Sequence, residues 1–197
     1  MNQTLPYHIA IFASGAGSNA LRIIEHFKNN SSVFIKLVLC NKPTAGVLQI
    51  ADDNNIEKIL IEKDHFFQSD FYIHLLKEKN IDLIVLAGFL WKIPINMIHA
   101  FPEKIINIHP ALLPKYGGKG MYGAHVHEAV IAAKEPKSGI TIHLVDEQYD
   151  HGKHLLQAEC SIDEYDTPDT LAQKIHTLEH RYFPKTIEKY IEELRKK

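Results

Sequence analysis

Apolar runs recur at regular intervals along the first half of the chain, with more polar segments between them. The runs at residues 7–13, 34–40, 56–61, 83–87 and 105–108 predict strands. The segments at residues 19–27, 46–54, 69–79 and 94–101 predict helices. This alternation predicts a doubly wound α/β fold with a mainly parallel sheet and right-handed crossovers.

The pattern changes after residue 138. Residues 139–145 and 155–160 form two closely spaced apolar runs, which we expect to add to the sheet as antiparallel strands. Thr167 and Pro168 then supply the N-cap and first position of a long final helix. No linker, internal repeat or low-complexity segment interrupts the sequence, so we expect a single domain over residues 1–197.

A glycine-rich turn, residues 14–19 with the sequence SGAGSN, follows the first apolar run. Gly15 and Gly17 allow a tight turn, and Ser18 and Asn19 offer helix caps or ligands. A strand, turn and helix in this order aim N–H groups at an anion. The segment lacks the last glycine of a dinucleotide fingerprint and the lysine of a P-loop, which favours a monophosphate ligand. A turn without a ligand remains the alternative.

Asn107, His109 and the distant Asp150 are the candidate reactive groups. Alternate side chains of a strand share a face, so Asn107 and His109 point the same way, and Pro110 ends the strand after them. An amide, an imidazole and a carboxylate can polarise a carbonyl and move protons. Ligands of such sheets bind beyond the carboxyl ends of the strands, so we expect this pair and the glycine turn to share one edge. A structural histidine is the alternative interpretation of His109.

Charge and composition narrow the function classes. With 22 Lys and Arg, 24 Asp and Glu and no basic block, nothing favours binding to nucleic acid or a membrane surface. The two cysteines suggest a reducing compartment. Residues 1–6 lack the features of a signal peptide, and no apolar run reaches the length of a membrane span. The sequence therefore predicts a cytoplasmic protein.

The thirteen histidines raise a metal hypothesis. Two of the candidate ligands are only two residues apart in a segment that looks helical, which would separate them. The chain has no HExxH motif and no cysteine pair at zinc spacing. We therefore expect no metal and no tightly bound cofactor. The candidate ligands considered were His125, His127, His143, His151 and His154.

Taken together, these segments resemble the phosphoribosylglycinamide formyltransferases, a folate-dependent enzyme family. The matching stretches occur in the family's order and cover essentially the whole chain: residues 14–19, 86–89, 107–116, 139–143, 149–150 and 179–180. The resemblance implies a Rossmann-like formyltransferase domain. It also implies formyl transfer from the cosubstrate 10-formyltetrahydrofolate to the amine of 5'-phosphoribosylglycinamide, in the biosynthesis of purines and IMP. The products are formylglycinamide ribonucleotide and tetrahydrofolate.

The resemblance assigns catalytic roles to three residues. Asn107 donates a hydrogen bond to the developing oxyanion, and His109 stabilises the same oxygen as imidazolium and shuttles the proton. Asp150 raises the pKa of His109 by the proximity of opposite charge and positions a water.

The resemblance also implies substrate contacts. Glu179 anchors the glycinamide amine or neighbouring polar groups, and the remaining ribonucleotide contact is between the phosphate and the glycine turn. The folate pterin lies along a main-chain segment where Trp91 and Lys92 replace a more usual pair, so only main-chain contacts are expected there. A basic residue that reaches folate in some relatives aligns near Ser69. The implied ribonucleotide contacts are Gly17, Ser18, Asn19 and Glu179, and the implied folate contacts are Leu90, Trp91, Lys92, Ile93 and Asn107.

Other functions remain as alternatives. Another enzyme that uses 10-formyltetrahydrofolate, such as a methionyl-tRNA formyltransferase or a formyltetrahydrofolate hydrolase, normally carries an added C-terminal or N-terminal domain. A regulatory nucleotide- or folate-binding protein would not need the three catalytic groups together. Residues 116–123 are either a lid over the ribonucleotide or a variable surface loop. Only small-molecule partners are expected, with the chain a monomer or weak homodimer.

Overall fold

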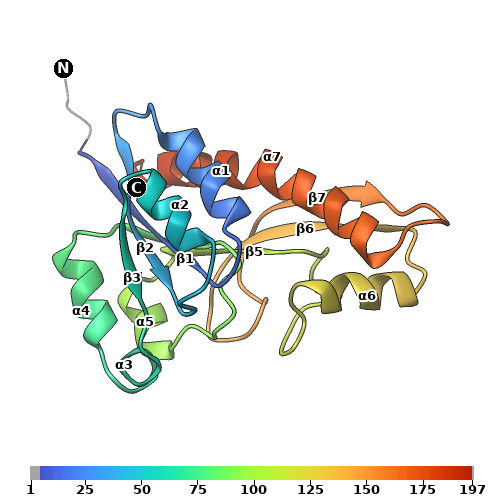
Figure 1. Ribbon diagram of the computed structural model, residues 1–197, viewed down its shortest axis with the longest axis horizontal. Helices are drawn as coiled ribbons and strands as arrows, with labels where there is room; N and C mark the ends of the chain where they lie inside the picture. Colours follow the sequence, from blue (N-terminus) through green and yellow to red (C-terminus); the bar gives the residue numbers. More distant parts are fainter. Residues whose placement is uncertain (1–4, 197) are drawn as a thin grey trace. The chain divides into compact units, whose positions relative to one another are not determined.

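The computed structural model describes residues 5–196 and contains a seven-stranded, mostly parallel sheet with helices between its strands (Figure 1). The strand order is β3-β2-β1-β4-β5-β6-β7, and β6 and β7 pair antiparallel. The predicted fold class is therefore confirmed. The prediction that residues 1–6 form no signal peptide includes residues 1–4, which lie outside the described residues.

The strands are β1 (Tyr7–Ala13), β2 (Val33–Cys40), β3 (Glu57–Leu60), β4 (Leu83–Leu86), β5 (Ile105–His109), β6 (Lys137–Leu144) and β7 (His154–Ser161). The helices are α1 (Ser18–Phe27), α2 (Val47–Asp53), α3 (Lys63–Gln68), α4 (Phe71–Glu78), α5 (Ile95–Ala100), α6 (Ala124–Ala132) and α7 (Pro168–Leu194).

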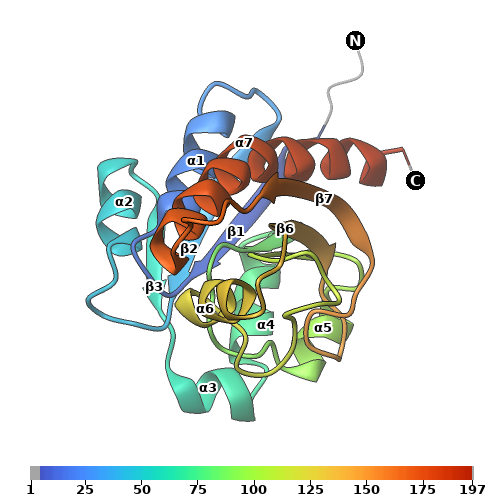
Figure 2. The ribbon, with the colours of Figure 1, turned by 90° about the vertical axis from the view of Figure 1, so that its right-hand side faces the viewer.

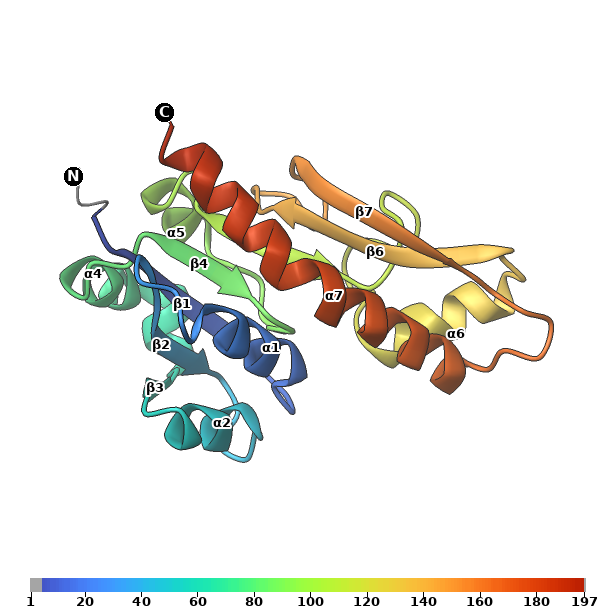
Figure 3. The same ribbon diagram turned by 90° about the horizontal axis from the view of Figure 1, so that it is seen from above.

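The chain divides into two compact units, Met1–Ile106 and Asn107–Lys197. In the first unit β1 pairs in parallel with β2 and β4, and β2 pairs in parallel with β3. Helices α1 and α2 lie on one face of these strands, and α4 and α5 lie on the other (Figure 3). Helices on both faces require strands that are apolar on both sides, which explains why every residue from position 9 to 13 is fully buried.

The second unit packs two helices against an antiparallel strand pair. Helix α7 contacts α6, β6 and β7 (Figure 2). Its first turn is held by a reciprocal cap, because Thr170 N–H donates to the Thr167 hydroxyl at 3.2 Å and Thr167 N–H donates to the Thr170 hydroxyl at 2.9 Å. Pro168 occupies the first turn, as the sequence predicts.

Helix α3 is absent from the sequence-based prediction, which assigned no structure to residues 62–68. Its six residues include no side-chain N-cap, so local signals are weak. Phe66 is 1% exposed and packs edge-on against Phe89 and Phe67, with ring centroids 5.7 and 5.1 Å apart. Tertiary burial of one aromatic side chain thus stabilises a helix too short to form alone. The bounds of the other predicted elements agree with the structure to within two residues.

Candidate active site

His109, the first catalytic candidate of the second unit to be described, lies at the carboxyl end of β5. The His109 side chain is 4% exposed, and its Nε2 lies 2.7 Å from the carbonyl oxygen of Tyr116. A carbonyl only accepts, so Nε2 carries a proton and the neutral ring has its lone pair on Nδ1. That Nδ1 lies 3.6 Å from Oδ2 of Asp150, which is 12% exposed. The structure therefore brings together a buried imidazole and a mostly buried carboxylate that are 41 positions apart in sequence.

His143, on β6, completes this cluster and is a residue that sequence reasoning did not include among the site residues. Its Nδ1 donates to the Leu144 carbonyl at 2.8 Å, which leaves Nε2 as an acceptor. Asn107 Nδ2 donates to that Nε2 at 3.1 Å, and Asp150 Oδ1 lies 3.6 Å from it. A signal was present in the sequence, since Thr141 and His143 are polar residues at alternate positions of an apolar strand.

Burial sets the charge state of this cluster. Burial lowers the pKa of His109 below its ordinary value and outweighs the opposing effects of the Asp150 charge and the Tyr116 hydrogen bond. Burial raises the pKa of Asp150, but contact with His143, the charge of His109 and the N–H of Gly118 together bring it below its ordinary value. At neutral pH the site therefore holds a carboxylate and a neutral imidazole. The Asp150 charge does raise the pKa of His109, as the resemblance implies, but burial has the larger effect and the net direction is downward.

The glycine turn of the first unit ends at Gly17, the N-cap of α1. Gly17 has φ of 85°, and a Cβ there would lie 2.8 Å from Cβ of Val47, so both conformation and space require glycine. A Cβ at Gly15 would meet nothing within 4 Å, so Gly15 is not needed for packing. The N-cap residue makes no side-chain cap, and Ser18 and Asn19 lie inside the first turn of α1. Of the two roles predicted for them, helix caps or ligands, the structure contradicts the first. The first-turn N–H groups have no acceptor within the helix and suit an anion.

A buried hydroxyl connects the glycine turn to the segment expected to bind folate. Ser14 is 2% exposed, and its Oγ accepts from Leu90 N–H at 2.9 Å while its own N–H donates to the Gly88 carbonyl at 3.0 Å. The Leu90 N–H is therefore used within the protein. The Trp91 ring packs with Phe67 at 5.3 Å between centroids. Its side chain thus belongs to an aromatic cluster of Phe66, Phe67, Phe89 and Trp91.

Glu179 lies in the middle of α7 and is buried. Its Oε2 is 2.9 Å from Nδ1 of His176, one turn earlier, and the Glu179 carboxylate is 7% exposed. The hydrogen bond to Glu179 raises the pKa of His176. The charge of Glu179 is also one of the influences that raise the pKa of His109, although burial dominates there. The structure therefore places Glu179 within electrostatic reach of the catalytic candidates.

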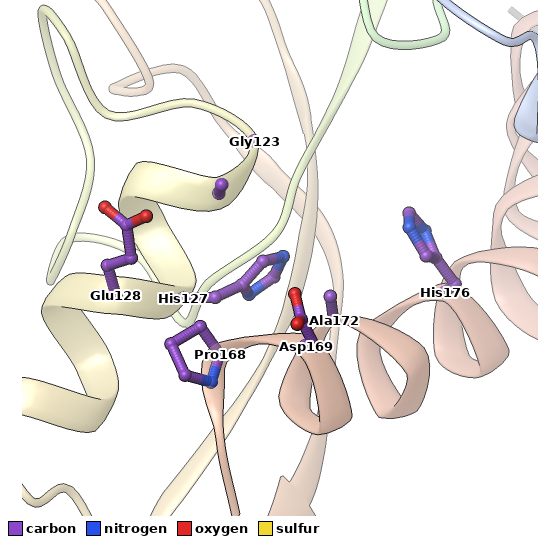
Figure 4. A pocket seen from close by; sticks show the side chains of 8 residues that line it. Gly123, His127, Glu128, Pro168, Asp169, Ala172 and His176 are labelled. Carbon is purple, nitrogen blue, oxygen red and sulfur yellow. The ribbon is translucent and has the colours of Figure 1, made fainter.

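A cavity of about 190 Å³ lies between α6 and the start of α7 (Figure 4). His127, Glu128, Asp169 and His176 provide its polar lining. This volume is below the roughly 300–1,000 Å³ of typical small-molecule sites. His127 is 5% exposed. Its Nδ1 has no hydrogen-bond partner, but this atom is buried and is not accessible to solvent in the cavity. No pattern in the sequence had indicated this cavity.

The histidines of the metal hypothesis do not converge in the structure. His125 and His127 lie on α6, His143 belongs to the cluster above, and His151 pairs with Asp146 at 2.7 Å. Across residues 5–196, no three His, Cys, Asp or Glu side chains are grouped so that they could hold a metal ion. Over the same residues, no helix combines the length and apolar character that crossing a membrane requires.

The family model for formyl transferases matches residues 7–187. A chloroplastic phosphoribosylglycinamide formyltransferase of Arabidopsis thaliana is 37% identical over 191 residues, which cover 94% of this chain and 65% of that protein. The Bacillus subtilis phosphoribosylglycinamide formyltransferase is 36% identical over 187 residues, covering 92% of this chain and 93% of that protein. The chain thus spans less than two thirds of the plant relative and almost all of the bacterial one.

Solved structures agree with these sequence matches. The phosphoribosylglycinamide formyltransferase of Bacillus halodurans superposes with a TM-score of 0.84 at 36% identity, covering 93% of this chain and 95% of that one. The corresponding enzyme of Streptococcus pneumoniae gives a TM-score of 0.82 at 32% identity, covering 94% and 99%.

Proposed function

Because this chain belongs to the formyl transferase family, we propose that it transfers the formyl group of 10-formyltetrahydrofolate to the amine of 5'-phosphoribosylglycinamide. The products are formylglycinamide ribonucleotide and tetrahydrofolate, a step of purine biosynthesis. The observation that carries the proposal is the buried cluster at the end of β5, where an ionised carboxylate lies 3.6 Å from a neutral imidazole. The names and near-complete coverage of the bacterial relatives support the choice of substrates.

The amine nitrogen attacks the formyl carbon, and the carbonyl oxygen gains negative charge in a tetrahedral intermediate. Asn107 stabilises this oxygen with an N–H of its amide, whose orientation is set by the hydrogen bond to His143. A preorganised donor of this kind lowers the barrier by roughly 3–4 kcal/mol.

Proton transfer uses His109 in its neutral form. Its Nε2 proton is engaged by Tyr116, so Nδ1 is the basic nitrogen. This nitrogen takes a proton from the attacking amine, and the resulting imidazolium is stabilised by Asp150 at 3.6 Å. When the bond between the formyl carbon and the folate nitrogen breaks, that nitrogen receives the proton.

Substrate binding is assigned to the remaining residues of the proposal. The first turn of α1, at Gly17, Ser18 and Asn19, holds the ribonucleotide phosphate, and Glu179 holds the glycinamide amine or neighbouring polar groups. The pterin lies along residues 90–93 and takes main-chain partners other than the Leu90 N–H, which Ser14 occupies. That the glycine turn and the pair Asn107 and His109 share one edge of the sheet stays a prediction.

The proposal extends to the organisation of the protein. Residues 1–197 form one formyltransferase domain, which the match over residues 7–187 supports. The partners are the two small-molecule substrates, with no nucleic acid, no membrane and no tightly bound cofactor. We also propose a cytoplasmic location and a monomer or weak homodimer. Among residues 5–196 both cysteines are free, in keeping with a reducing compartment.

One assay tests the function directly. The purified chain is supplied with 10-formyl folate and, in separate reactions, with phosphoribosylglycinamide, methionyl-tRNA or no acceptor other than water. We expect formyl transfer to depend on the ribonucleotide. Equal turnover without it would identify a hydrolase, and transfer to methionyl-tRNA alone would identify a different formyltransferase.

A further inference from the structure

A short loop segment, residues 115–118, touches both partners of the proton-transfer pair. The Tyr116 carbonyl accepts from His109 Nε2 at 2.7 Å. Two residues later, the Gly118 N–H donates to Asp150 Oδ2 at 2.9 Å, the same oxygen that faces His109 Nδ1. The position of this one segment therefore sets both the tautomer of the imidazole and the orientation of the carboxylate.

The backbone of this segment does not favour its own conformation. Tyr116 has φ of 56°, in the left-handed region that is unfavourable for a residue with a side chain. The adjacent Gly117 is tightly packed, since a Cβ there would lie 2.5 Å from Cδ2 of Leu113 and 3.3 Å from Cβ of Asp150. A strained backbone of this kind persists only where surrounding contacts hold it.

Glu135, in the loop between α6 and β6, supplies such contacts. Its Oε1 accepts from the Tyr116 hydroxyl at 2.9 Å and from Lys115 Nζ at 2.8 Å. The Glu135 side chain is 22% exposed, and Lys115 is 68% exposed. The hydrogen bond from Lys115 lowers the pKa of Glu135, so the acceptor stays ionised at neutral pH. One carboxylate thus holds two consecutive residues of the segment.

We propose that Glu135 and the Tyr116 hydroxyl form a positioning clamp for the proton-transfer pair. By holding the Tyr116 side chain, the clamp keeps the Tyr116 carbonyl on His109 and the Gly118 N–H on Asp150. Both clamp residues act through the pair. The catalytic consequence of the clamp rests on the proposed function, whereas its effect on the imidazole does not.

The test compares Tyr116→Phe and Glu135→Gln with a matched control. Tyr116→Phe removes the hydroxyl that donates to Glu135, and Glu135→Gln removes the charge of the acceptor, while both conserve side-chain shape. Glu159→Gln is the control, because Glu159 pairs with Lys137 at 2.7 Å on the exposed surface of the same unit. The readouts are the ¹⁵N NMR signals of His109 across pH, together with kcat and KM for both substrates.

We expect both clamp variants to lose the single Nε2–H tautomer of His109 and to change its titration. We expect kcat to fall about 10- to 100-fold, the range for losing a hydrogen bond to a charged group, with both KM values nearly unchanged. The control should match the wild type in every readout. If Tyr116→Phe does not fold, Glu135→Gln, which leaves the aromatic ring in place, decides the question.

Two outcomes overturn the clamp. One is an unchanged His109 tautomer and titration in folded variants. The other is a rise in KM with kcat retained, which indicates an ordinary structural contact. A wild-type protein without formyl transfer activity would refute the proposed function instead, and the NMR comparison would still decide whether the clamp orients His109.

Discussion

Replacing Asp150 by asparagine should expose how much the carboxylate contributes to proton transfer. The substitution keeps the shape of the side chain and removes its charge. At the 3.6 Å between Oδ2 and His109 Nδ1, the attraction between a carboxylate and an imidazolium is about 4.6 kcal/mol at an effective dielectric constant of 20. Both side chains are nearly buried, at 12% and 4% exposed, so solvent screens little of this attraction.

The attraction acts only when His109 carries the transferred proton, so its loss raises the barrier and not the binding energy. Each 1.36 kcal/mol corresponds to about a tenfold change in rate, so full loss of the interaction would lower kcat by roughly three orders of magnitude. We expect a fall of about 10²- to 10³-fold, with smaller changes in KM. The pKa of His109 should fall further below its ordinary value, because burial then acts unopposed by the Asp150 charge.

The assays are steady-state kinetics and histidine NMR titration of the wild type, Asp150→Asn, and the double variant with His109→Ala. Since the two groups act as a unit, the double variant should be little slower than the slower single variant. Asp146→Asn is the matched control, because Asp146 pairs with the exposed His151 at 2.7 Å. An unchanged His109 titration, or rate losses that multiply in the double variant, would refute the reasoning.

Three further perturbations address the rest of the site. Asn107→Ala should lower kcat by roughly two to three orders of magnitude with the fold intact by circular dichroism; retention of most of kcat would remove the amide from the chemistry. Gly17→Ala should lower the thermal midpoint, since φ is 85° and the new Cβ would lie 2.8 Å from Val47, and should raise the KM of the ribonucleotide more than that of folate. Equal changes in the two KM values would contradict the phosphate site. Because burial lowers the pKa of His109, its proton-accepting form persists on acidification, so the acidic limb of log kcat/KM should have its midpoint below pH 6.5; a midpoint above pH 6.5 would contradict a lowered pKa of His109.

The order of elements was predictable because burial on both faces leaves a simple pattern. The run at residues 9–13 is continuous and apolar, and the structure buries all of it. The pair Asn107 and His109 was equally visible, since strand periodicity puts both on one face. Helix α3 was not visible, because Phe66 is held by aromatic rings from other segments and not by local signals.

Two features of the candidate site depend on the folded structure more than on the local sequence pattern. His143 lies 36 positions from Asn107, and only strand pairing brings the two side chains to 3.1 Å. The charge state of His109 depends on how completely it is buried, and neighbouring residues in sequence do not determine burial. The sequence identified the opposing Asp150 charge but not the larger effect that outweighs it.

His109 and His143 are both buried imidazoles, but they differ in their hydrogen bonds and therefore in the roles they can take. Each donates one ring proton to a carbonyl, His109 through Nε2 to Tyr116 and His143 through Nδ1 to Leu144. The second nitrogen of His143 is occupied, because it accepts from Asn107 at 3.1 Å. The second nitrogen of His109 faces a carboxylate oxygen at 3.6 Å, beyond hydrogen-bond distance, and gains a favourable partner only when it is protonated. Hydrogen bonding thus makes His143 the support for the oxyanion donor and His109 the proton carrier.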